Sequence, residues 1–84
     1  MDIINGLIHG VEIAPTPIDL YVVTFMLGGE RCKASNDLAR TIEALEGQEV
    51  QSEGFWRPYR GEREFNVRSI KYRTAAGGFV TVVE

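Results

Sequence analysis

Residues 21–54, YVVTFMLGGERCKASNDLARTIEALEGQEVQSEG, carry the pattern that decides the fold of this 84-residue chain. Apolar side chains alternate over residues 20–27, which predicts a half-buried strand with these residues on one face: Tyr21, Val23, Phe25 and Leu27. Gly28-Gly29 then predicts a two-residue hairpin turn into a strand over residues 30–34. The stretch therefore opens with a β-hairpin.

The second half of the stretch predicts a helix followed by another strand. Ser35 or Asn36 can cap the helix, and its apolar positions recur at helical spacing: Leu38, Ile42 and Leu45. Gly47 ends it. Residues 49–56 alternate again, with these residues outward: Glu49, Gln51 and Glu53.

Outside this stretch the remaining segments are also strands. Residues 3–13 predict a first strand that changes phase, with Ile4 and Ile8 on one face and Leu7, Val11 and Ile13 on the other, as in a bent or bulged strand. Downstream we expect a loop over 57–63, a strand over 64–72 and a last strand, Phe79–Val83. The chain is predicted to be one domain, residues 1–84, mainly β: a small barrel of five to six strands with one helix between strands three and four.

Basic and aromatic residues concentrate in one segment of an acidic chain. The net charge is −3, but residues 1–53 carry three cations against nine anions, whereas residues 54–73 carry six against two. That segment also holds five of the eight aromatic residues. Single-stranded nucleic acids need cations for their phosphates and flat rings for their unpaired bases, so the segment favours such a ligand.

The layout resembles the oligonucleotide-binding fold (OB-fold), and in particular bacterial single-strand DNA-binding and primosomal replication proteins. The resemblance rests on the segments INGLIHGVEI, YVVTFMLGGERCKA and GQEVQSEGFWRPYRGEREFNVRSIKY, and covers about residues 3 to 73. It implies a binding face on the second and third strands, flanked by loops at residues 14–18 and 56–63. The chain lacks the Gly-rich linker and acidic tip typical of those proteins.

Residue pattern and resemblance together give a candidate site with two kinds of side chain. Phosphate-binding cations and base-stacking rings are expected among eight residues: Arg31, Lys33, Trp56, Arg57, Tyr59, Arg60, Arg63 and Arg68. The competing interpretation is that the loop arginines pair with acids, named here as Glu53, Glu62 and Glu64, and that Trp56 or Phe55 belongs to the core. Phe65 fits the core. Tyr21 and Phe25 share a face that is either core or stacking platform, and the core is favoured. The function expected is binding of single-stranded nucleic acid with weak sequence preference, and DNA is a more expected ligand than RNA.

Several other functions find little support in the sequence. No phosphate-binding glycine loop, nucleophile motif or metal-ligand spacing is present, so we expect no enzyme, no cofactor and no metal site. Cys32 and His9 are expected to be structural. No segment reads as a signal peptide or membrane span, which makes the cytoplasm the expected location. The alternative function is a protein-interaction module, a homodimer or a subunit of an assembly, in which a partner adds to a sheet edge. The apolar N-terminal strand, the edge strand Phe79–Val83 and the net acidity favour it.

Overall fold

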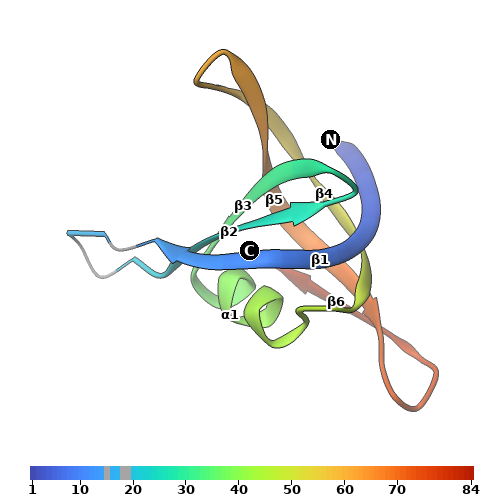
Figure 1. Ribbon diagram of the computed structural model, residues 1–84. Coiled ribbons are helices and arrows are strands. Elements are labelled where there is room, and N and C mark those ends of the chain that lie inside the picture. The colour runs from blue at the N-terminus through green and yellow to red at the C-terminus, as the bar shows by residue number, and fades with distance from the viewer. Residues whose placement is uncertain (15, 18–19) are drawn as a thin grey trace.

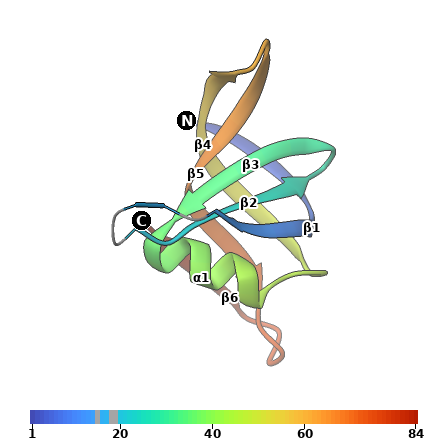
Figure 2. The same cartoon turned by 60° about the vertical axis from the view of Figure 1, so that its left-hand side comes forward.

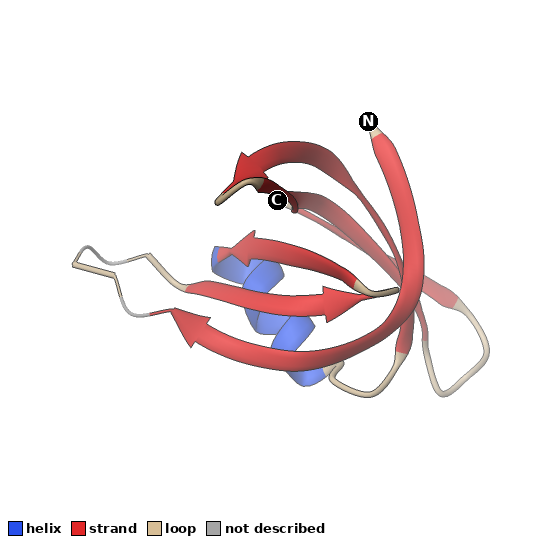
Figure 3. Cartoon of the chain, turned by 45° about the horizontal axis from the view of Figure 1, so that its top comes forward, coloured by secondary structure: helices blue, strands red, loops and turns tan. Residues whose placement is uncertain are grey.

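The structure is a computed structural model that describes residues 1–14, 16–17 and 20–84. Within these described residues, six strands and one helix follow one another: β1 (Asp2–Ala14), β2 (Val22–Leu27), β3 (Glu30–Ser35), α1 (Asn36–Ala44), β4 (Glu49–Tyr59), β5 (Glu62–Arg73) and β6 (Phe79–Val83). The predicted fold is confirmed, because the molecule is mainly β with its helix between strands three and four (Figure 3).

The first five strands close into a barrel. β1 pairs antiparallel with both β2 and β4, β2 with β3, and β4 with β5. A short parallel pairing of β3 with β5, Cys32 opposite Phe65 and Lys33 opposite Asn66, completes the circle. β6 adds to the far end of β5. Since the parallel pairing covers only two residues of each strand, a groove lies beside it.

The barrel interior is filled by alternating apolar side chains. Phe25 and Phe65 are buried, as predicted, and Tyr21 is partly buried against the core. The helix α1 buries Leu38, Ala39 and Ile42 against this core. The tip of the β4–β5 hairpin and the turn between β5 and β6 lie at opposite ends of the molecule in two views, with α1 between them (Figure 1, Figure 2).

The predicted faces of β1 need one correction. Its register against β2 shifts between His9 and Glu12, where Gly10 has a φ of +63°. This bulge inserts a residue and reverses the alternation beyond it. Val11 therefore packs against the core with Ile4 and Ile8, instead of sharing the exposed face of Leu7.

The predicted loop over residues 57–63 is also wrong. β4 and β5 stay paired up to Tyr59 opposite Glu62, so only Arg60 and Gly61 form the turn. Both have positive φ, 47° and 79°, as the central residues of a type I′ hairpin do. Pro58 is accommodated because the hairpin has left the barrel and its edges there are free. We call residues 55–66 of this hairpin the ribbon.

Candidate nucleic-acid interface

The two faces of the ribbon carry different residues. Cross-strand pairs join Phe55 with Asn66, Arg57 with Glu64, and Tyr59 with Glu62. Because side chains alternate along a strand, these pairs share one face. The intervening pairs, Trp56 with Phe65 and Pro58 with Arg63, occupy the other. The predicted ribbon residues are thus divided between two surfaces.

The face that bears Arg57 continues onto the barrel. In β3 the side chains of Cys32 and Ala34 are buried, so Arg31 and Lys33 point outward. Lys33 lies beside Asn66 through the parallel pairing, and beside Thr24 on β2. We call this surface the outer face; it is formed by Thr24, Met26, Arg31, Lys33, Phe55, Arg57, Tyr59, Glu62, Glu64 and Asn66. The outer face therefore connects β2 and β3, on which the resemblance implies a binding face, to one side of the ribbon.

Arg31 is engaged within the outer face. Its Nε donates a 2.7 Å hydrogen bond to Glu64 Oε2, and its guanidinium lies 4.4 Å from the centre of the Tyr59 ring. The hydrogen bond to Glu64 holds the pKa of Arg31 above its usual value. Glu64 is itself buried. Arg31 therefore orders Tyr59, while much of its charge is neutralised locally.

Trp56 faces away from the outer face and is partly covered. Its ring meets Phe65 edge-on, with 4.8 Å between ring centres, and the Arg63 guanidinium lies 3.9 Å above it. Arg63 Nη2 also donates to Glu30 Oε1 at 3.2 Å. Of the two neighbouring rings, Phe55 is the open one, with 48% of its surface exposed. Phe55 was not among the eight expected residues, although strict alternation from the inward Ser52 and Gly54 predicts its direction.

The six expected cations fall into two groups. Three are paired with acids, Arg31 with Glu64, Arg63 with Glu30 and Arg68 with Glu84. In the part of the chain that the structure describes, three have no ion pair: Lys33, Arg57 and Arg60. Arg60 lies 5.3 Å from the Tyr59 ring. Among the described residues, none of the three acids expected as partners forms an ion pair with a loop arginine: Glu64 pairs with Arg31 of β3, and Arg63 pairs with Glu30 instead.

A groove of about 210 Å³ opens where β3 and β5 diverge beyond their parallel pairing. Three cations line it, Lys33, Arg57 and Arg68, against one carboxylate, Glu84. Asn66 also lines it, and its Nδ2 is buried with no hydrogen-bond partner among the described residues. A buried donor without an acceptor is costly, so the groove suits an anionic ligand oxygen. We call it the β3–β5 groove.

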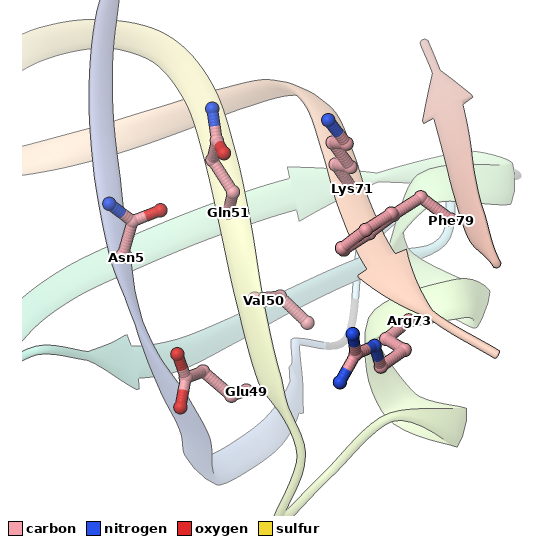
Figure 4. A pocket seen from close by; sticks show the side chains of 7 residues that line it. All are labelled: Asn5, Glu49, Val50, Gln51, Lys71, Arg73 and Phe79. Atoms are coloured by element: carbon pink, nitrogen blue, oxygen red, sulfur yellow. The ribbon is translucent and has the colours of Figure 1, made fainter. Parts of the chain in front are cut away.

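A second basic and aromatic surface lies elsewhere on the barrel and was missed by the sequence interpretation. Figure 4 shows Phe79 between Lys71 and Arg73, whose charged groups lie 4.9 and 5.6 Å from the ring centre. These residues border a hollow of about 510 Å³ with Asn5 and Gln51. The sequence shows that Lys71 and Arg73 are two residues apart on one strand. It does not show that Arg73 lies opposite Phe79.

Three remaining expectations concern the flanking loop at residues 14–18, metal binding and membrane-spanning segments. The predicted flanking loop at residues 14–18 includes Pro15 and Ile18, which lie outside the described residues. Within the described ranges no three His, Cys, Asp or Glu side chains gather where they could hold a metal ion. No helix among those same residues has both the length and the apolar character to cross a membrane.

Comparison with known proteins identifies no relative of this chain. No family model, no curated protein and no solved structure matches the chain.

Proposed function

We propose that this protein binds single-stranded nucleic acid, DNA before RNA, along its outer face and in the β3–β5 groove. The observation that carries the proposal is that the cations and Asn66 of this groove lie on the same side of the strands as two rings, Phe55 and Tyr59. Phosphates would be bound by Lys33 and Arg57, with Asn66 Nδ2 donating to a phosphate oxygen. Bases would stack on Phe55, and Tyr59, whose ring Arg31 and Arg60 contact, would border the bound strand.

The arrangement favours an unpaired strand over a duplex. Stacking on Phe55 requires a base whose face is free, which a base pair in a helix does not offer. Cations and rings recognise features common to all nucleotides, so weak sequence preference follows. The resemblance to single-strand DNA-binding proteins supports the same ligand and motivates the order DNA before RNA.

The net charge of −3 does not oppose this ligand. At physiological ionic strength charges are screened over about 8 Å, so a phosphate in the groove responds mainly to the nearby cations. Of the six expected cations, Arg31, Arg63 and Arg68 are already paired with acids among the described residues, which leaves Lys33, Arg57 and Arg60 to neutralise phosphates. About three contacts predict that log affinity for a single strand falls by about 2 per tenfold rise in salt.

The test is fluorescence anisotropy of labelled single-stranded DNA, single-stranded RNA and duplex DNA across a salt series. We expect single-strand binding at low salt, weaker duplex binding, and a large loss in Lys33→Glu combined with Arg57→Glu. The control is Arg40→Glu on the exposed side of α1, which matches the charge change of Arg57→Glu alone and should leave affinity nearly unchanged. Absence of binding to either single strand at low salt refutes the proposal.

Substitution of single rings tests the stacking role. Phe55→Ala should weaken single-strand binding by about 5- to 150-fold, since a stacked base contributes about 1–3 kcal/mol. Phe79→Ala is the matched control, because Phe79 is also exposed (63%) but lies outside the outer face. Equal losses in the two variants would exclude Phe55 as the stacking platform.

A further inference from the structure

The strand β6 is an unprotected edge of the sheet. It pairs with β5 on one side only, and no other described strand pairs with it. Its sequence, Phe79–Val83 (FVTVV), contains no charge, proline or bulge of the kind that keeps edge strands from pairing with other chains. Phe79 and Val83 are 63% and 69% exposed, so the strand is apolar and open to solvent.

The backbone groups that face the free edge can be identified from the ladder. Thr74 N–H donates to Gly78 O, and Glu84 N–H donates to Arg68 O, so Gly78 and Glu84 are both at hydrogen-bonded positions. Such positions alternate along an antiparallel ladder. Hence Val80 and Val82 also bond to β5, whereas the N–H and C=O groups of three residues point away from it: Phe79, Thr81 and Val83.

We propose that β6 is a homodimer interface, in which two copies of this chain pair their β6 strands antiparallel about a two-fold axis at Thr81. In this register Thr81 lies opposite Thr81, and Phe79 lies opposite Val83 of the second copy. All three outward-facing residues then become hydrogen-bonded pairs at once. The two barrels join through one continuous sheet.

Side chains and charges fit a second copy of the chain. The register sets each Phe79 against a Val83 and the two Thr81 residues against each other, and aromatic–β-branched and Thr–Thr pairs both stabilise antiparallel sheets. Arg73 stands beside the start of β6, opposite Phe79, and Glu84 follows its end. Antiparallel pairing brings the end of each strand that bears Glu84, which is ion-paired with Arg68 of its own chain, to the end of the other strand that Arg73 flanks. β6 itself contains no charged residue, so the charged residues that give each copy its net negative charge lie outside the contact between the two strands.

The experiment measures mass by analytical ultracentrifugation over a concentration series, up to about 1 mM, the weak end of specific association. We expect the mass to rise from 9.4 kDa toward twice that value. Thr81→Pro removes the N–H donor at the axis without touching the β5–β6 ladder, and should weaken dimerisation at least tenfold. Thr81→Ala keeps the N–H and should dimerise within a few-fold of the unaltered chain. Thermal melting verifies that each variant is folded.

A cross-link tests the register and does not depend on the proline variant. Thr81→Cys places one thiol in each strand at the axis, close enough for a disulfide. The native Cys32 is fully buried and should not react. Ala76→Cys, exposed in the adjacent turn, should form little disulfide under the same conditions. A chain that stays monomeric at the highest concentration overturns the proposal, as does a dimer that Thr81→Pro leaves intact. Because these residues lie off the outer face, either result leaves the nucleic-acid proposal standing.

Discussion

Gly54 is the position where a single methyl group should damage the fold most directly. A Cβ built on Gly54 would lie 2.0 Å from Asn66 O and 2.9 Å from Asn66 C, both backbone atoms of the neighbouring strand. Ordinary contact needs about 3.4 Å or more, so β5 would have to retreat by more than about 1 Å. Asn66 cannot move freely, because β5 is held there by β4 on one side and by Lys33 of β3 on the other.

The magnitude follows from this geometry. Overpacking of a well-packed site costs about 1–3 kcal/mol and more where no side chain can rotate away, so we expect Gly54→Ala to cost about 3 kcal/mol or more. A domain of this length has an unfolding free energy of roughly 4–13 kcal/mol, so the loss is a large fraction of it. Urea unfolding monitored by circular dichroism measures the change.

Gly78→Ala is the matched control for this substitution. A Cβ at Gly78 would meet only the Thr74 hydroxyl, at 3.8 Å, an ordinary contact. We expect its cost to stay below about 1 kcal/mol. If Gly54→Ala were as stable as Gly78→Ala, the close approach of β4 and β5 would be refuted.

Two further predictions concern single side chains. Arg63→Ala removes the guanidinium that lies above Trp56, the only tryptophan. We expect Trp56 emission to shift to longer wavelength and acrylamide quenching to increase, with a loss in the free energy of unfolding of about 1 kcal/mol or less. Unchanged emission would contradict the packing of Arg63 on Trp56. Burial raises the pKa of the Cys32 thiol to about 12, so the folded thiol stays protonated while the unfolded thiol ionises above pH 9. The free energy of unfolding should therefore fall between pH 9 and 12 more steeply than in Cys32→Ala, and a thiol reagent at pH 8 should not label the native protein.

The elements of the barrel were predictable because their signals are local. Alternation over residues 20–27, the Gly28-Gly29 turn and the helical spacing of Leu38 and Ile42 each act within a few residues, and all three predictions are confirmed. The hairpin tip was predicted as a loop because Pro58 and Gly61 usually interrupt strands. Pairing between β4 and β5 outweighed that tendency, and the strands continued to the Arg60-Gly61 turn.

The candidate site was predicted less completely, for a different reason. Composition identified the segment that holds the cations and rings, but not the ring that is free, since Trp56 is covered by Phe65 and Arg63 while Phe55 is open. Nor could it find the acids that pair with Arg31 and Arg63. Those acids lie 33 residues away in sequence and become neighbours only when the barrel closes.

The sequence by itself determined the strands, the helix, their order and the concentration of positive charge in residues 54–73, because propensity and alternation are properties of neighbouring residues. The tertiary structure alone decided which side of a strand faces water beyond a register shift and which cations remain unpaired. Faces depend on single-residue register shifts, such as those at His9–Glu12 and Glu53–Gly54, and a shift of one residue exchanges inside for outside. Charges depend on contacts between distant segments, and only closure of the barrel brings these together.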